Sequence, residues 1–499
     1  MIYLYSKCIA YPADVVEQNS LQSESVSLLR TVMWGIAGIL PISVMLGGLS
    51  ATAGYASPFV ILLALGIILL ISVPVLEYTR LAKFAGGYYG AAELGFGKTV
   101  GKFVGLSNYV FYLGWQLGNA AFIATVVAVG YYAVYSTYPP AFVYFSAGFL
   151  ALFVPFLSSI LNVKKVSAIV TYMTIIGIVL NIFAIGLLFA HATHFSLNQF
   201  NPSYAPGGLH GALFSLVVYG FFTYAGYGFL LFYSEEGKSP FKNTWKAAVI
   251  ALVISTVISV IVLYAINAVY GSVGILKAIA FPQPGLLLYV RYLGATGELL
   301  IVAFLVILFL FSFASGSGSQ ARLLYTLSRD GFFKNKWIGK LNKNRVPANQ
   351  LFLSFVIATV LFFVQGAILI PAYGYFSAIF YMAYVPSTIA TVFWYFHHLI
   401  PDLSLSNFFR KHNIRLSSPR PLVTSIVAPV VATVLIVYSL YESIIADTVE
   451  PYFAGVVLSA IVVLGLALWV VFKWHRGTIG RSSVEEMLNT EAIEKMMTK

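Results

Sequence analysis

The residues best suited to bind a small ligand lie in an apolar segment that glycines interrupt. Residues 213–233 are apolar enough to lie in lipid, yet they contain Thr-Tyr-Ala-Gly-Tyr-Gly at 223–228 and another glycine at 220. Glycine weakens a helix by about 1 kcal/mol relative to alanine. A helix broken at membrane depth has free N–H and C=O groups, which could bind a ligand. The alternative is that these glycines only allow close helix packing.

A second interrupted segment lies near the start of the chain. Residues 34–48 contain Pro41, which removes a helix hydrogen bond, and glycines at 38, 47 and 48. Broken helices in corresponding positions of two halves indicate the binding site of a transporter. The positive end of a half-helix suits a carboxylate, and the carbonyl groups of the other half suit an ammonium group or a metal cation.

The composition places these segments in a membrane protein. Of 499 residues, 60% are hydrophobic and 9% are charged, whereas a soluble chain is about a quarter charged. The single cysteine, Cys8, excludes an intrachain disulfide and a multi-cysteine metal site. The first thirty residues contain no long apolar run, so no cleaved signal peptide is expected.

The elements that must position the ligand groups are predicted to be twelve transmembrane helices, since each span needs about 20 apolar residues. The predicted spans are residues 30–50, 58–78, 101–134, 140–161, 166–191, 210–233, 245–269, 297–321, 349–367, 375–397, 421–441 and 452–473. Segment 285–295 is apolar but short, which favours a re-entrant or interfacial helix.

The basic residues support an even number of spans with both termini cytoplasmic. With the N-terminus inside, the Lys and Arg residues gather in the inner loops, while the outer loops hold only Lys277 and Arg291. The net charge of +12 therefore reflects topology, and nucleic-acid binding is not expected. No Asp or Glu is predicted deep inside a span, so the site should favour a ligand without a large net charge, such as a zwitterion.

Four motifs resemble those of the amino acid–polyamine–organocation transporters, of the amino acid permease type. They fall at the expected helices, between residues 30 and 350. The motifs are 222–227 with Glu235-Glu236 and Lys-Ser-Pro-Phe-Lys-Asn at 238–243; Glu77 with Gly-Gly-Tyr-Tyr at 86–89; Leu161-Asn162 with Lys164-Lys165; and 322–331 with Val346-Pro347.

The resemblance implies an all-α membrane fold of twelve helices, with a core of two inverted five-helix repeats in which helices 1 and 6 are broken. It divides the chain into a cytoplasmic tail (1–29), a first repeat (30–191), a second repeat (208–397), two further helices (421–473) and a second cytoplasmic tail (474–499). It also implies transport by alternating access. The substrate site carried over by the resemblance comprises Leu40, Pro41, Ile42, Ser43, Phe222, Thr223, Tyr224, Ala225 and Gly226, with Phe222 as the occluding aromatic.

The chain departs from the family pattern at three places. Leu40-Pro41-Ile42 replaces the usual Gly-x-Gly, which makes carboxylate contacts there less certain. Gly228 replaces an acidic residue, which puts selectivity for strongly cationic substrates in doubt. Gly177 or Ile178 replaces a lysine of helix 5, so proton coupling through such a lysine is unsupported.

Several other residues have a functional and a packing interpretation. Ser312 and Ser315 share a helix face and could bind a coupling sodium ion, or could simply allow close packing. Trp115 and Gln116 could line the pocket, and Tyr381 and Tyr384 could form a gate, or all four could pack. His397 and His398 are interpreted as interface residues rather than metal ligands.

The sequence therefore predicts a secondary active transporter in the cell membrane, for small neutral amino acids, working by cation symport or exchange. It implies no cofactor beyond coupling to Na⁺ or H⁺, and it does not fix the oligomeric state. Other amines, amides, polyamines or nucleobases are alternative substrates. An intramembrane enzyme would need a catalytic cluster such as HExxH, which the sequence lacks, and a receptor or channel fits two broken helices poorly.

Overall fold

The chain forms a bundle of helices. The computed structural model describes residues 20–39, 43, 45–281, 283–414, 420–441 and 450–497, and within these ranges it contains no β-strand beyond two isolated bridges. Eight helices in the described residues are long and apolar enough to cross a membrane. The all-α prediction is confirmed, whereas the number of twelve spans stays a prediction.

The described α-helices have the following bounds: α2 (Leu28–Ile39), α4 (Gly48–Ala53), α5 (Ser57–Leu81), α6 (Tyr88–Phe96), α7 (Lys98–Tyr135), α8 (Ala141–Ser159), α9 (Val163–Ala190), α10 (Gly208–Ser215), α11 (Phe221–Tyr224), α12 (Pro240–Ala278), α13 (Pro284–Ser312), α14 (Ala314–Arg329), α15 (Ala348–Lys411), α16 (Arg420–Tyr441), α17 (Glu450–His475) and α18 (Thr490–Met497). Short 3₁₀ or π segments join some of them. These are η1 (Gly54–Ala56), η2 (Leu197–Phe200), η3 (Pro202–Tyr204), η4 (Leu216–Gly220), η5 (Ala225–Tyr233) and η7 (Glu485–Met487).

Glycine hinges explain why some helices are longer than one span. Helix α15 has 64 residues and includes two of the predicted spans, 349–367 and 375–397. Gly374 has φ 74° and ψ 160°, which L side chains rarely adopt, so the chain turns there. Gly294 turns α13 in the same way (φ 69°). The part of α13 before it matches the short segment predicted at 285–295.

Both predicted breaks contain described residues that leave the α-helix. Near the first break, residues 45–47 form a turn in which Gly47 has φ 76°, between α2, which ends at Ile39, and α4, which begins at Gly48. The later segment passes from a π-helical turn, η4, through the four-residue α11 into the 3₁₀ segment η5. Because π and 3₁₀ turns do not continue the α-helical hydrogen-bond ladder, backbone groups are freed in the middle of this element.

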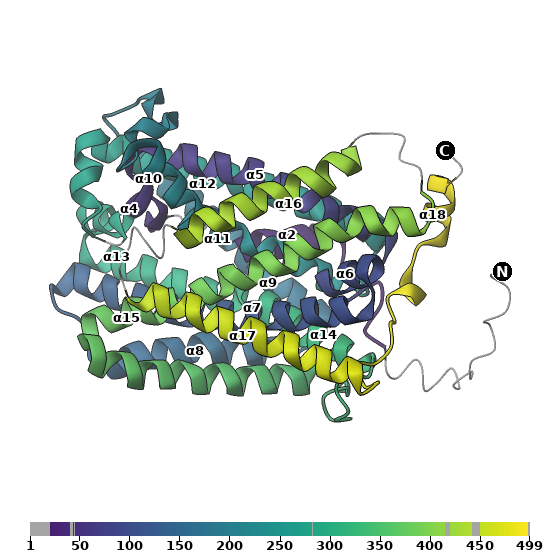
Figure 1. The fold of residues 1–499 in the computed structure, drawn as a ribbon. Coiled ribbons are helices and arrows are strands. Elements are labelled where there is room, and N and C mark those ends of the chain that lie inside the picture. Colours follow the sequence, from purple (N-terminus) through teal and green to yellow (C-terminus); the bar gives the residue numbers. More distant parts are fainter. Residues whose placement is uncertain are drawn as a thin grey trace.

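The bundle surrounds α7, which packs against α15, α6, α8 and α13. In Figure 1, α16 and α17 lie along one side, and the segment that ends in α18 reaches the end of the bundle near α6 and α14. Large apolar side chains are exposed on outer helices, for example Tyr172 (66%), Ile182 (62%) and Ile461 (61%). Exposed apolar residues in this number suit a lipid environment rather than water.

Candidate functional site

A cavity of about 180 Å³ lies beside the two breaks. A cavity of about 150 Å³ holds benzene, so this one can take a ligand of roughly six to eight non-hydrogen atoms. Ten elements or short segments contribute its lining. The lining residues are Gly38, Ile39, Ser43, Gly48, Leu49, Trp115, Gly118, Asn119, Phe122, Val217, Tyr219, Thr223, Gln283, Ala383, Tyr384, Ser387, Thr388, Thr391, Val392, Tyr395, Ile436, Leu440 and Val456.

The lining is apolar with hydroxyl and amide groups. Its polar members in the described chain are Ser, Thr, Tyr, Asn and Gln, and none of these lining residues is acidic or basic. Residues beside both breaks contribute to the lining, namely Gly38 and Ile39 at the first break and Thr223 at the second. Such a surface can hydrogen-bond to a ligand without neutralising a net charge.

Two of the predicted substrate residues line the cavity together. Ser43 and Thr223 face it, one from each break. Leu40, Pro41 and Ile42 lie outside the described residues. The backbone of Phe222 lies in α11, and its side chain is outside what the structure describes, so its predicted occluding role stays a prediction.

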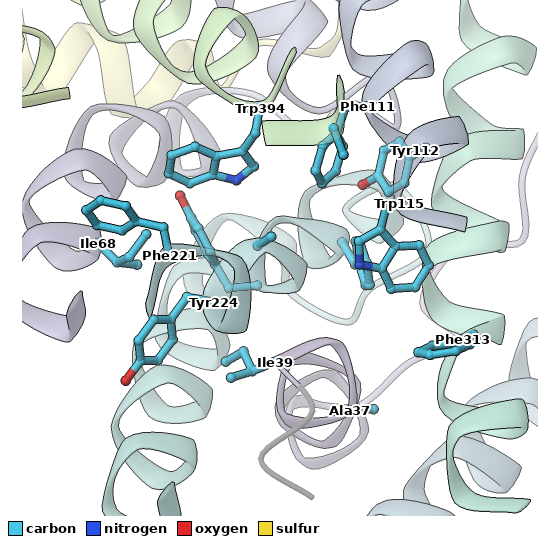
Figure 2. Packing of buried hydrophobic residues seen from close by; sticks show 14 of the residues in the cluster. Ala37, Ile39, Ile68, Phe111, Tyr112, Trp115, Phe221, Tyr224, Phe313 and Trp394 are labelled. Atoms are coloured by element: carbon cyan, nitrogen blue, oxygen red, sulfur yellow. The ribbon is translucent and has the colours of Figure 1, made fainter. Parts of the chain in front are cut away.

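Three other predicted residues lie behind the cavity. The Tyr224 hydroxyl lies 2.6 Å from Thr256 Oγ1 and donates to the Ile61 carbonyl at 3.2 Å, on the α5 and α12 side. In Figure 2 its ring points away from Trp115. Ala225 and Gly226 are buried where η5 crosses α2.

The crossing of α2 and η5 depends on glycine at both positions. A Cβ built at Gly38 would lie 2.6 Å from the Gly226 carbonyl oxygen, and a Cβ at Gly226 would overlap the Gly38 carbonyl. Real Cβ atoms essentially never lie this close to another heavy atom. The two glycines therefore set how closely the broken elements approach.

Helices α7 and α15 form the wall opposite the breaks. Trp115 lines the cavity and packs edge-on against Phe313, with ring centroids 5.2 Å apart (Figure 2). Gln116 does not line it and instead donates to Ser317 Oγ at 3.2 Å. Tyr384 lines the cavity, whereas Tyr381 stacks edge-on with Tyr373.

Sequence reasoning missed most of the α15 contribution. Ser387, Thr388, Thr391 and Tyr395 follow a helical spacing along one face of α15, and all line the cavity. The 387/388/391/395 pattern of hydroxyl residues inside a predicted span was the signal that could have found them.

The end of the bundle near α6 and α14 is closed below the cavity by rings and ion pairs. The Trp34 and Tyr233 rings lie 4.0 Å apart, and the Arg322 guanidinium lies 3.9 Å from the Tyr233 ring centre. Arg322 Nη2 donates to Glu236 Oε1 at 2.9 Å. Arg322 is 3% exposed and Glu236 is fully buried, so the pair is held away from water.

A second layer of charges lies beside this pair. Arg329 binds Glu235 through two hydrogen bonds, of 2.9 and 3.0 Å. Fully buried Lys102 donates to Asp330 Oδ2 at 2.8 Å and to Glu93 Oε2 at 3.3 Å. Burial raises the pKa of Glu93, although the ammonium group of Lys102 opposes this shift.

The C-terminal segment covers this closed end. Arg481 donates its N–H to the Asp330 carbonyl at 2.7 Å and accepts from Lys102 Nζ at 2.9 Å. Fully buried Val484 fills a hollow lined by Phe84, Gly90 and Leu94. The segment therefore stabilises the closed arrangement.

Replacing Val484 with Asp is expected to release the C-terminal segment. A carboxylate placed in this apolar hollow without a partner costs several kcal/mol, so the segment should detach. Trypsin cleavage after Arg476 and Arg481 should then accelerate by roughly a hundredfold, which corresponds to about 2.7 kcal/mol. Replacement of the neighbouring exposed Glu485 with Ala is the control and should leave the cleavage rate unchanged. An unaltered rate in the Val484→Asp protein would show that the hollow does not hold the segment.

The proposed cation residues lie at the junction of α13 and α14. Ser315 Oγ donates to the Ser312 carbonyl at 2.8 Å, and the Ser315 carbonyl accepts from the Tyr233 hydroxyl at 3.1 Å. Both serines are buried. Sodium binding there stays a prediction, which unchanged sodium dependence in a Ser315→Ala protein would exclude.

The interpretation of His397 and His398 as interface residues was wrong. Helix α15 continues to Lys411, beyond its predicted end at 397, and it packs against α6. His397 is 1% exposed, and both His398 and Asp402 are fully buried. Glu298 on α13 is fully buried as well, and the expectation that no acidic residue lies deep inside a span stays a prediction.

Comparison with known proteins gives two findings. A model of the amino acid permease family matches residues 26–397. The chain is also similar to proteins named "Low-affinity putrescine importer PlaP" from Escherichia coli K12 and from Escherichia coli O157:H7. Each is 23% identical over 377 residues, which cover 74% of this chain and 81% of the relative.

Proposed function

Because the chain belongs to the amino acid permease family, whose members are membrane transporters rather than enzymes, we propose that it carries small neutral amino acids across the cell membrane by secondary active transport. The resemblance seen in the sequence motifs is thereby confirmed at the level of the family. The amino acid, the coupling and the site residues belong to the proposal.

The observation that carries the proposal is the chemistry of the cavity. It lies between two interrupted elements, admits roughly six to eight non-hydrogen atoms, and has hydroxyl and amide groups but no acidic or basic side chain among its described lining residues. A zwitterion of this size has no net charge, so backbone N–H groups could bind its carboxylate and backbone carbonyls its ammonium group. Ser43 and Thr223 stand at the two breaks in positions to add hydroxyl contacts.

Import of a diamine is the second candidate, because the relatives carry the name of a putrescine importer. The rings of Trp115, Tyr219, Tyr384 and Tyr395 in the lining could attract an ammonium group. A diamine carries two positive charges, however, and burying them without a carboxylate costs more than aromatic faces return. Gly228 stands where many family members have an acidic residue, which also argues against a diamine substrate.

The proposed architecture follows the sequence. Twelve spans would form two inverted repeats at 30–191 and 208–397, with two further helices at 421–473. The basic loops would place both termini in the cytoplasm. The ion-paired end covered by the C-terminal segment is then the cytoplasmic end, and the cavity belongs to a state closed toward the cytoplasm. Rocking of the broken elements against the remaining helices would open that end.

The proposal is tested by a substitution, Gly48→Phe, that fills the cavity without displacing the residues around it. A Cβ at Gly48 would have only Gln283 and Tyr219 near it, at 3.9 Å, so Gly48→Phe should fold and project its ring into open space. We expect exchange of labelled neutral amino acids in proteoliposomes for the wild type, and a loss of about a hundredfold for Gly48→Phe, since the ring takes the substrate volume.

The matched control is Gly66→Phe. Gly66 is exposed on α5 and has no atom within 4 Å of its Cβ position, so the same substitution there should leave exchange unchanged. Full exchange by folded Gly48→Phe protein would refute this cavity as the site. Absence of exchange of every neutral amino acid by the folded wild type would refute the proposed substrate class.

A further inference from the structure

A polar cluster that the substrate cavity does not use lies further along α15. His398 Nε2 is 2.8 Å from the Tyr227 hydroxyl and 3.1 Å from the Tyr88 hydroxyl, and His398 Nδ1 is 3.1 Å from the Trp394 carbonyl. A carbonyl oxygen only accepts, so Nδ1 carries the ring proton and Nε2 accepts from the tyrosines. The neutral imidazole is therefore fully satisfied.

Asp402 lies one helical turn beyond His398 and has no such partners. It is fully buried, and neither of its carboxylate oxygens has a hydrogen-bond partner among the described residues. An ionised carboxylate in this position would cost several kcal/mol. The neutral, protonated carboxyl group is therefore the form that this arrangement stabilises.

No positive side chain among the described contacts of this cluster offsets that cost. The titratable groups that face the pair are Tyr78 from α5, Tyr88 from α6, Tyr112 from α7, Tyr227 from η5, and His397 on α15 itself. The tyrosines keep their protons at neutral pH, and for Tyr88 burial raises the pKa further. The described side chains around the Asp402 carboxyl group are thus all uncharged.

The cluster connects the interrupted segment η5 to the wall of the cavity formed by α15. Tyr227 belongs to the 3₁₀ segment η5 and follows Gly226, which contacts the first break. On α15, Val392 and Tyr395 line the cavity, His398 lies about one turn further on, and Asp402 about one turn beyond that. A displacement of η5 against α15 must therefore withdraw the Tyr227 hydroxyl from His398.

We propose that Asp402 is the proton-binding site through which a proton gradient drives substrate movement, with His398 and Tyr227 positioning η5 over it. The inference rests on the proposed transport function and adds its coupling ion. In the state described here, the carboxyl group holds the proton. When η5 moves away, water reaches Asp402, the O–H bond breaks, and the proton passes to water as the carboxylate forms. Because the proton binds one conformation more tightly than the other, it biases their equilibrium.

The test separates coupling from transport. In proteoliposomes, the rate of substrate exchange without a gradient measures transport alone. The accumulation of substrate under an inward proton gradient of one pH unit measures the coupling of transport to the proton. One proton per substrate gives about tenfold accumulation in the wild type. Asp402→Asn, which mimics the permanently protonated group, should keep exchange within about twofold and accumulate nothing above the outside concentration. Asp402→Ser is a second neutral variant with the same expectation.

Glu298→Gln is the matched control. Glu298 is also fully buried with two unpartnered carboxylate oxygens, but it lies on α13 beside Gly130. Its replacement should leave the tenfold accumulation intact. Wild-type accumulation in the Asp402 variants, or accumulation in the wild type that follows a sodium gradient and ignores the proton gradient, would overturn the inference while leaving the transport proposal standing.

A measurement without substrate tests directly whether Asp402 is protonated. Infrared spectra of the lipid-embedded protein at neutral pH should show the C=O stretch of a protonated carboxyl group that disappears in Asp402→Asn and remains in Glu298→Gln. This result would support the site even if the first amino acids tried were not exchanged. A wild-type spectrum identical to that of Asp402→Asn in this region would show that Asp402 holds no proton and would refute the proposal.

Discussion

Replacing Gly226 with leucine is expected to abolish uptake. A Cβ at this position overlaps the Gly38 carbonyl, which belongs to the backbone and cannot turn aside as a side chain can. Overpacking a core costs about 1–3 kcal/mol when side chains can adjust, and a backbone collision costs more. The broken elements would have to separate, and we expect transport in proteoliposomes to fall by at least about a hundredfold, equal to about 2.7 kcal/mol.

The sequence resemblance places Gly226 in the substrate site, where a leucine side chain would be expected to fill the substrate space. In the structure, Gly226 lies behind the cavity, so the effect should arise from the helix crossing. Gly38→Ala should then be nearly as damaging, because its Cβ meets the Gly226 carbonyl oxygen at 2.6 Å. Gly66→Leu on the exposed face of α5 is the control. Normal uptake by folded Gly226→Leu protein would show that this crossing is not required.

Neutralising Glu236 should strongly destabilise the protein. Glu236→Gln leaves the buried Arg322 guanidinium without its carboxylate partner, and removing one partner of a buried pair costs about 3–5 kcal/mol. We expect a lower unfolding temperature in detergent and at least tenfold slower uptake, since the closed end that this pair holds would no longer form stably.

Two further variants test whether the unpaired charge of Arg322 causes the loss of stability. The exposed pair Arg481–Glu486 has both side chains 62% exposed at 3.8 Å, so Glu486→Gln should change stability by less than about 0.5 kcal/mol. Combining Glu236→Gln with Arg322→Met removes both charges and should recover much of the stability. If the double variant is as unstable as Glu236→Gln alone, the unpaired Arg322 is not the source of the effect.

The sequence predicted the membrane class, the two breaks and the family correctly because these features depend on local composition. Glycine and proline interrupt a helix wherever they occur in an apolar run, and the described residues leave the α-helix at 45–47, 216–220 and 225–233. Ser43 and Thr223 beside them line the cavity, as expected of residues at the ends of interrupted helices.

The rest of the site depends on which helix faces meet, and one sequence does not contain this information in readable form. The hydroxyl residues of α15 reach the cavity because Gly374 turns the helix and α15 packs along α7. A proline normally ends a helical pattern, so a helix continuing past Pro401 was not expected. That continuation buries Asp402 together with His397 and His398, the two residues that the sequence had placed at an interface.

The contacts of the C-terminal segment could not be predicted for a similar reason. Its polar composition is typical of a solvated tail, but its few apolar residues occupy hollows formed by α5 and α6. Whether a short apolar side chain finds such a hollow is decided by the tertiary structure alone.

The central claim is that the cavity selects a neutral zwitterion, and equilibrium binding to the purified protein tests it most directly. Labelled alanine, or the neutral amino acid exchanged best, would be bound to the wild type and displaced by unlabelled amino acid or by putrescine. The account predicts displacement by the neutral amino acid and none by putrescine at about a hundredfold excess, because the described lining offers no carboxylate. Saturable binding of labelled putrescine, lost in Gly48→Phe, would contradict the claim and assign the cavity to a diamine.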